Sequence, residues 1–347
     1  MKLLKVALFA CMTSVLGAAG GIWGLENDRE AYTGMVWEYT LSDFGDGAYQ
    51  AGIKALFRSF EERTGKYLVP GSEGKVGIKI YTNSGRGLAT PKPLVKAVIG
   101  ELVNRGYERR QIFLLDADEF HLRESGYIPP LSERKRGKIF DGVPVYILDS
   151  ADHFDPVWYY ESPLPAQSQL ASSAELFGTF GGETRPDDRK SFLAKPLLTD
   201  VDFWINIPMV TDHPTMGING SLVNATLWNI GNRNRFFVSP ANAPIAVAEI
   251  AAIPELSSSW ALTLIPLERY QFIGGPVFNS LYTRSETLLW MSVNPVILDV
   301  LMLRRLNNDR LSMGFPPISD NLPLINYAES LGLGTRDINL IQWIRFP

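Results

Sequence analysis

Hydrophobic and polar positions follow two periods along this chain, which predict strands and helices in turn. Val76–Tyr81 and Gln111–Leu115 are short apolar or β-branched runs, typical of strands. Between them, apolar residues recur at helical spacing up to a stop near Gly106. That helix is expected to begin at Thr90-Pro91, where the hydroxyl caps the helix and proline takes its first position. Strand, helix, strand predicts a right-handed βαβ unit.

The same patterns continue on both sides of this unit. A helix is expected over Tyr49–Thr64, ended by Gly65, whereas residues 22–70 carry no clear strand pattern. Further strands are predicted at Val143–Leu148, Val201–Ile207, Trp260–Ile265, Thr287–Ser292 and Ile338–Ile344. Further helices are predicted at Gly217–Ile230, Ala243–Ala252, Pro295–Leu306 and Leu322–Leu331.

This alternation predicts an α/β fold: a mainly parallel sheet with helices on both faces. A Pro/Gly-rich stretch, Tyr160–Arg189, is expected to form a long excursion within about residues 150–200. That excursion could hold a short hairpin.

The first residues have the layout of a signal peptide. Met1–Lys5 is positive, Val6–Leu16 is mainly apolar, and Gly17–Gly21 supplies small residues, with cleavage expected after Ala19. The apolar run is shorter than the roughly 20 residues that cross a bilayer. We therefore expect removal of this segment and an exported protein, periplasmic or extracellular. The expected organisation is 1–19 signal peptide, 20–70 N-terminal extension packed on the main domain, and 71–347 α/β domain.

Composition narrows the classes of function. The 347 residues are 46% hydrophobic and 20% charged, as in ordinary globular proteins. The net charge of -4, with both signs mixed along the chain, gives no reason to expect nucleic-acid binding. No segment after the leader is long and apolar enough to span a membrane. Cys11 is the single cysteine, so the mature chain would have no disulfide, cysteine nucleophile, zinc–thiolate site or cysteine-ligated iron–sulfur cluster.

The loop Thr82–Thr90 is the first candidate site. It joins the end of a predicted strand to a helix N-terminus, where free N–H groups and the helix dipole favour an anion. The hydroxyls of Ser84 and Thr90 and the guanidinium of Arg86 can donate hydrogen bonds, and Gly85 permits close approach of the backbone. We expect a small phosphate- or carboxylate-bearing ligand here. The other interpretation is a glycine turn with a solvated arginine.

Lys79 lies inside the preceding strand and, by strand alternation, points away from Ile78 and Ile80. A lysine in a sheet is costly unless it is paired or functional. It is therefore a candidate catalytic or anion-binding residue. The alternative is an edge-strand lysine in solvent.

The second candidate is His213 with Asn219 and Asn224, after another predicted strand. Imidazole can act as acid, base or metal ligand, and the amides can orient a substrate. The alternative is Asn/Asp/Gly turn chemistry with a helix cap.

Acidic and histidine residues raise the question of a metal site. Asp116, Asp118 and His121 could ligate a divalent ion, but acidic capping of a helix over Ala117–Glu124 is the favoured interpretation. The segment Asp152–Asp155 has the same two interpretations, metal ligation or a structural role, and whether a metal binds stays open. Asp299, in the first turn of a predicted helix, is interpreted as structural.

Four segments in order resemble one family, the domain of unknown function 362, whose biochemical activity is unassigned. They are the Lys79 strand leading through Thr90-Pro91 and Gly106 to Leu114–Asp118, then Asp202–Pro208 with Asp212–Asn224, then Gly274–Pro276 with Ser292–Asp299, and finally Ala328–Gly334. The chain departs from the family's usual lysines at Thr211 and Val223 and from its usual aspartate at Asn294. A family site that depends on those charges would be changed here.

Two functions follow as expectations. One is an enzyme acting on a small anionic substrate, with His213 as acid or base and Lys79 holding the anion. The other is a non-catalytic binding protein for an anionic metabolite or polymer. Both require the candidate residues to gather at the carboxyl ends of the strands: Lys79, Ser84, Gly85, Arg86, Thr90, Asp116, His213, Asn219 and Asn224.

Overall fold

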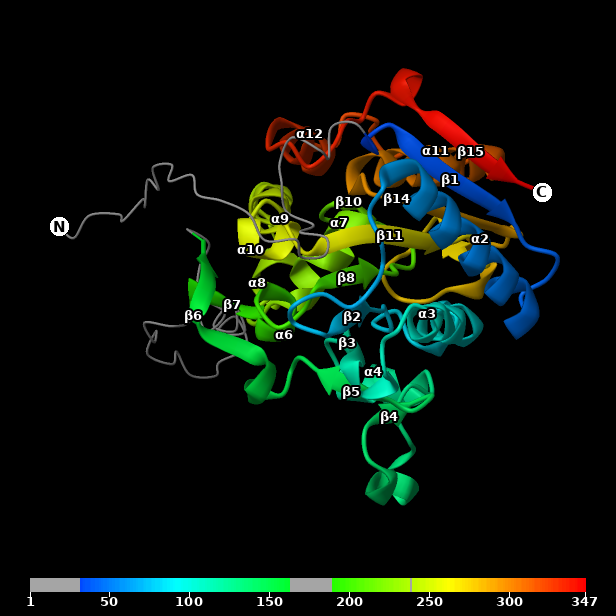
Figure 1. Cartoon of the computed structure of the whole chain (residues 1–347). Helices are drawn as coiled ribbons and strands as arrows, with labels where there is room; N and C mark the ends of the chain where they lie inside the picture. The colour runs from blue at the N-terminus through cyan, green and yellow to red at the C-terminus, as the bar shows by residue number, and fades with distance from the viewer. Residues whose placement is uncertain (1–31, 163–188, 238) are drawn as a thin grey trace, which may run out of the picture.

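The computed structural model describes residues 32–162, 189–237 and 239–347, and these form a nine-stranded sheet covered by helices (Figure 1). The strand order is β15-β1-β14-β11-β8-β2-β3-β5-β4. Neighbours from β11 to β5 are parallel, and β15 is parallel to β1, whereas β14 and β4 run antiparallel to their neighbours. The predicted mainly parallel sheet is therefore confirmed.

The strands of this sheet follow closely the apolar runs of the sequence. Their bounds are β1 (Met35–Thr40), β2 (Val76–Lys79), β3 (Ile112–Asp116), β4 (Ile139–Phe140), β5 (Val143–Ile147), β8 (Phe203–Asn206), β11 (Trp260–Pro266), β14 (Leu288–Ser292) and β15 (Gln342–Phe346).

Helices pack on both faces of the sheet, as predicted (Figure 1). On one face lie α2 (Asp46–Thr64) and α3 (Lys92–Asn104), and on the other lie α7 (Ser221–Ala225), α9 (Ala243–Ala251), α11 (Pro295–Ser312) and α12 (Pro323–Ser330). Alternation along β2 decides which side chain meets which layer: Ile78 packs with α2 and α3, whereas Tyr81, just past the strand, packs with the opposite layer.

Short elements complete the described chain. The remaining helices are α4 (Glu119–Glu124), α6 (Lys195–Leu198), α8 (Asn234–Phe237) and α10 (Pro254–Ser257). The 3₁₀ segments are η2 (Arg86–Leu88), η3 (Arg109–Gln111), η4 (Leu131–Arg136), η5 (Ala151–His153), η8 (Leu227–Asn229), η9 (Ser280–Tyr282) and η10 (Ile338–Leu340). Among the helices of the described segments, none combines the length and apolar character of a membrane span.

Two smaller sheets flank the large one. A four-stranded sheet contains β10 (Gly217–Asn219), β9 (Thr211–His213), β12 (Tyr270–Gln271) and β13 (Thr283–Arg284) in that order. An antiparallel pair, β6 (Phe154–Glu161) and β7 (Lys190–Ala194), joins the two ends of the expected Pro/Gly-rich excursion. Residues 163–188, the body of that excursion, lie outside the described residues.

Strand β1 was not predicted, because its sequence lacks alternation. Val36 faces the α11 layer and Trp37 faces the α2 layer, and both are fully buried. A strand covered on both faces shows no polar side, so periodicity cannot reveal it.

Two further predictions were wrong in detail. The expected last strand, Ile338–Ile344, starts instead at Gln342, because the side chain of Asp337 caps the η10 turn before it. The single helix expected over Gly217–Ile230 is divided into β10, α7 and η8.

The start of α3 differs from the predicted cap. Pro91 is the N-cap, and no side chain caps the helix. The hydroxyl of Thr90 instead accepts from the Tyr81 amide (2.8 Å) and donates to the Ile207 carbonyl (2.9 Å). Thr90 therefore ties the loop after β2 to the end of β8. The predicted stop near Gly106 is confirmed, since Gly106 has φ 106°.

Candidate functional site

Lys79 ends β2 and is fully buried. Its Nζ donates to Asp116 Oδ1 (2.6 Å), to the Ile80 carbonyl (2.6 Å) and to Asn224 Oδ1 (3.1 Å). An ammonium group has three donors, so these three acceptors satisfy it. The structure therefore brings together three of the predicted residues, Lys79, Asp116 and Asn224.

Asp116 and two asparagines extend this cluster, which we call the lysine network (Lys79, Asp116, Asn206 and Asn224). Asp116 Oδ2 accepts from the amide and the hydroxyl of Thr82, both at 2.7 Å, and Oδ1 accepts from the Ala117 amide (2.8 Å). Asn224 Nδ2 donates to Asn206 Oδ1 (2.8 Å). The network thus links the ends of β2, β3 and β8 to α7.

Burial is the dominant electrostatic effect on Lys79. It lowers the pKa of this amine, whereas the adjacent Asp116 carboxylate raises it and the more distant Arg233 lowers it. Because every donor of Lys79 already meets a protein acceptor, the network is built to hold strand ends together.

Ser84 and Asn219 lie beside a second buried group, the phenol of Tyr81. The Ser84 and Tyr81 hydroxyls are 2.8 Å apart, and Tyr81 packs edge-to-face against Trp228 at 5.9 Å. Asn219 Oδ1 accepts from Trp228 Nε1 (2.9 Å), while its buried Nδ2 has no partner within the described chain. Burial raises the pKa of Tyr81, so this hydroxyl is protonated at neutral pH.

His213 lies in the small sheet, on β9, rather than in the lysine network. Its Nδ1 accepts from the amides of Thr215 (3.1 Å) and Met216 (3.4 Å). Burial lowers its pKa to about 4, so the ring is neutral near pH 7. The ring contacts Phe237, whose ring contacts Trp228. The structure therefore places His213 as an acceptor in a turn.

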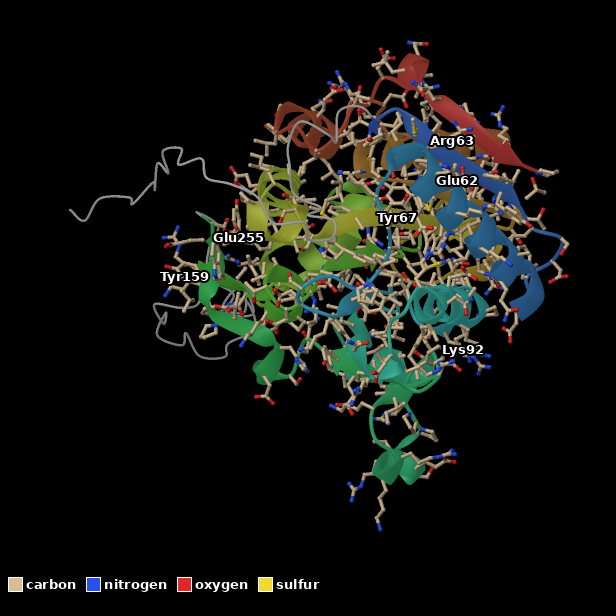
Figure 2. The ribbon with its side chains drawn as sticks, in the orientation of Figure 1. Glu62, Arg63, Tyr67, Lys92, Tyr159 and Glu255 are labelled. Carbon is tan, nitrogen blue, oxygen red and sulfur yellow. The ribbon has the colours of Figure 1, made fainter. Side chains whose placement is uncertain are left out.

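A separate cavity of about 270 Å³ opens beside the N-terminus of α3. We call it the basic cavity, because Arg86, Lys92 and Arg269 line it. Its residues follow β2, β8 and β11, three neighbouring parallel strands. Lys92 lies at the molecular surface near the start of α3 (Figure 2). Arg269 Nη1 donates to the Gly87 carbonyl (2.6 Å), which ties the guanidinium to the loop.

Two further polar groups line the basic cavity. The hydroxyl of Ser125 is buried and has no hydrogen-bond partner among the described residues. Glu268 accepts from the Tyr49 hydroxyl (2.8 Å), and burial raises the pKa of its carboxyl group. Of the sequence-predicted residues, Arg86 and Thr90 line this cavity, with Gly85 directly before them in the loop.

Sequence reasoning missed four polar lining residues: Lys92, Ser125, Glu268 and Arg269. Lys92 had a visible signal, because it directly follows the predicted helix start at Thr90-Pro91. The others reach the cavity from the end of α4 and from the turn after β11, and no local spacing connects them to the loop.

The possible metal ligands have other roles where they are described. Asp118 is the N-cap of α4 and accepts from the His121 amide (2.8 Å), which confirms the capping interpretation. Asp155 accepts from the amides of Val157 and Trp158. Within residues 32–162, 189–237 and 239–347 no three His, Cys, Asp or Glu side chains are grouped to hold a metal ion.

Asp299 supports the lysine network from α11. Its carboxylate accepts from the amides of Ser221 (2.6 Å) and Leu222 (3.1 Å), the first residues of α7, which carries Asn224. Burial raises the pKa of Asp299 to about 6, although the hydrogen bonds from the amides of Ser221 and Leu222 act to lower it. The predicted structural role fits these contacts.

Comparison with known proteins identifies no family for this chain. No family model matches the chain, and no curated protein matches it. Among solved structures it is similar to a structural-genomics target from Thermotoga maritima, with 14% identity and a TM-score of 0.33 over 78% of this chain and 59% of the other. It is also similar to the lactate racemase apoprotein of Thermoanaerobacterium thermosaccharolyticum, with 13% identity and a TM-score of 0.30 over 76% and 56%. The chain spans less than two thirds of each of these proteins, and likeness at this level carries no inference about activity.

Proposed function

We propose that this protein binds a small anionic ligand, bearing a phosphate or carboxylate group, in the basic cavity. One observation carries the proposal: Arg86, Lys92 and Arg269 line a single cavity together with Ser125, whose buried hydroxyl has no partner among the described residues. That cavity lies at the carboxyl ends of adjacent parallel strands, the edge at which open α/β sheets bind their ligands.

The donors around the cavity suit an oxyanion. A guanidinium group can donate two parallel hydrogen bonds to a carboxylate or phosphate, and a lysine adds a point charge. At about 270 Å³ the cavity is below the roughly 300 Å³ at which pockets for drug-sized molecules begin, so the ligand is small.

In this proposal Lys79 positions the loop and does not contact the ligand. Asp116, held by Lys79, binds Thr82 at the start of the loop, and Thr90 pins its end to Ile207. The loop carries Arg86 between these two anchors.

Inorganic phosphate is expected to bind the purified protein, and Arg269→Gln is expected to weaken that binding about tenfold, the effect of losing one charge-assisted hydrogen bond. Ser125→Ala is expected to weaken binding without lowering the unfolding temperature, because it removes a buried hydroxyl that has no partner. Isothermal titration calorimetry and thermal unfolding measure both effects.

Arg63→Gln is the matched control, since Arg63 is an exposed arginine at the end of α2, away from the loop (Figure 2). Equal phosphate affinity in the Arg269 and Arg63 variants would refute the basic cavity as the site. A loss of stability in Ser125→Ala would show that its hydroxyl serves the fold.

Sulfate binding is expected to weaken as the pH rises above 4.5, the ordinary pKa of a glutamate, because the Glu268 carboxyl group, whose pKa is raised by burial, becomes negative inside the cavity. Sulfate keeps its charge over this range, so a change reports on the protein. Glu268→Gln should bind sulfate more tightly, and its affinity should depend less on pH. A parallel slope in this variant would assign the dependence to another group.

An enzyme acting on the bound anion is the second candidate. The observation in its favour is again Glu268, a carboxyl group with a raised pKa beside the donors, which suits proton transfer. In an enzyme, Glu268→Gln would retain binding and lose turnover of the substrate.

The resemblance to domain of unknown function 362 and the expected export belong to this proposal. The departure at Asn294 preserves local geometry, since Asn294 Oδ1 accepts from the Ile297 amide (3.0 Å) and caps α11 as an aspartate would. Val223 is fully buried in the apolar core, where a lysine would need a partner. The mass of the protein recovered from the culture medium or periplasm tests removal of residues 1–19.

A further inference from the structure

A second cavity, of about 200 Å³, lies between α11 and the strands β1, β14 and β15. Two indoles line it, Trp290 of β14 and Trp343 of β15, with ring centroids 5.9 Å apart in an edge-to-face arrangement. Three arginines also line it, Arg304 and Arg305 from α11 and Arg345 from β15. We call this set the arginine–tryptophan cavity. None of its lining residues belongs to the basic cavity.

The indoles hold two of the guanidinium groups in place. The Arg305 guanidinium carbon lies 5.2 Å from the ring centroid of Trp290, and that of Arg345 lies 4.8 Å from the ring centroid of Trp343. Cations over aromatic faces are attracted by the ring quadrupole. The guanidinium groups of Arg305 and Arg345 are thereby held in fixed orientations, and some of their N–H donors remain available to a ligand.

Charge in this cavity is incompletely compensated. Arg345 Nε donates to Glu38 Oε1 (3.0 Å), and Arg305 forms an ion pair with Glu286. Glu38 also accepts from Trp290 Nε1 (2.8 Å). Arg304 is exposed, and within the described segments it has no hydrogen bond or ion pair. One guanidinium group is therefore free to bind an anion.

We propose that the arginine–tryptophan cavity binds a small organic anion, a carboxylate joined to a flat apolar group such as an aromatic ring. Arg304 recognises the carboxylate, with the spare donors of Arg305 and Arg345 beside it, and the indoles with Leu301 form the apolar wall. The cavity is smaller than the roughly 300 Å³ of pockets for drug-sized ligands, which restricts the ligand to a single ring.

A purely structural role is the alternative, in which the stacked arginines hold β14 and β15 against α11. That structural use explains Arg305 and Arg345, each of which has an acidic partner. It does not explain Arg304, which has no hydrogen bond or ion pair among the described residues, although it also lines a neighbouring cavity with Asp320, Glu329 and Asp337. Replacement of Arg304 therefore distinguishes a ligand-binding site from a purely structural contact between these elements.

The probe is benzoate, titrated into the full chain by calorimetry and followed by tryptophan fluorescence. Benzoate is expected to bind, with acetate and benzyl alcohol at least about tenfold weaker, because each lacks one half of the recognised chemistry. Arg304→Gln is expected to weaken benzoate binding about tenfold, the effect of one charge-assisted hydrogen bond, at an unchanged unfolding temperature.

Two controls separate this site from the basic cavity. Arg63→Gln removes an exposed arginine from α2, and Arg269→Gln removes a donor from the basic cavity. Both should keep the wild-type affinity of the benzoate site that Arg304→Gln weakens. Benzoate bound in the basic cavity would be a second site, and Arg269→Gln would weaken that site instead. Absence of benzoate binding, equal binding of benzyl alcohol, or a loss in Arg269→Gln that matches the loss in Arg304→Gln would overturn the proposal.

Discussion

Replacing Asp116 with alanine is expected to lower the free energy of unfolding by about 3–5 kcal/mol, the cost of leaving a buried charge without its partner. Lys79 would keep an ammonium group in a fully buried position with no counter-ion. The amides of Thr82 and Ala117 would also lose their acceptor. Urea denaturation followed by circular dichroism measures the change.

The companion variant Lys79→Met is expected to cost less than Asp116→Ala, because the Asp116 carboxylate keeps its donors from Thr82 and Ala117. The double variant should cost less than the sum of the two single variants, since the charges depend on each other. Glu62→Ala, which breaks an exposed ion pair with Arg58, is the control and should change stability by no more than about 0.5 kcal/mol. Equal effects of Asp116→Ala and Glu62→Ala would show that the lysine network does not stabilise the fold.

Acidification from pH 6.5 to about 4 is expected to destabilise the protein through His213, by an amount on the order of 3 kcal/mol. The folded state lowers the pKa of this imidazole from 6.5 to about 4, because burial disfavours the charged ring. Its contribution is therefore fully present above pH 6.5 and is lost as the pH falls toward 4. Protonation also removes the Nδ1 acceptor from the amides of Thr215 and Met216.

Asp299 opposes this trend. The folded state raises its pKa from 3.8 to about 6, so its contribution is present below pH 3.8 and is lost as the pH rises through 6. The measured quantity is the slope of unfolding free energy against pH in urea titrations. Asp299→Asn should steepen the loss on acidification, and His213→Asn, which keeps an acceptor, should flatten it. An unchanged slope in His213→Asn would exclude His213 as the titrating group.

The same histidine separates the two functions predicted from sequence. If His213 serves the turn, His213→Ala lowers stability at neutral pH and leaves phosphate affinity in the basic cavity unchanged. A catalytic His213 would instead lose turnover with its fold and binding retained.

Strand and helix order could be predicted because most strands have clear apolar runs and the three longest helices, α2, α3 and α11, each end within two residues of a glycine. The predicted gathering of polar side chains was also partly visible in the sequence: Lys79 and Asp116 end their strands, Asn224 lies in the helix after β10, and the three meet in the structure. Strand β1 could not be predicted, because Val36 and Trp37 are buried on opposite faces. Local patterns carry no information about which layer will cover a strand.

The candidate binding residues likewise divide into those with a local sequence signal and those brought together only by the fold. Arg86 could be identified because a loop before a helix is a local feature. Glu268 and Arg269 could not, since only the sheet order brings the end of β11 beside the loop after β2. His213 was proposed as a catalyst from its residue type, whereas its neighbours two and three positions along the chain occupy its ring nitrogen.

The position of β1 between β14 and β15 has a consequence for how the chain folds. Met35–Thr40 pairs only with segments about 250 and 300 residues later in the sequence. During synthesis, both edges of this strand remain unpaired until the last part of the chain has been made. Contacts of such long range must close a large loop before they stabilise anything, which slows folding and leaves exposed edges able to pair with other chains. Completion of this side of the sheet is thus a late event in folding, and the half-made protein is the form most in need of chaperones.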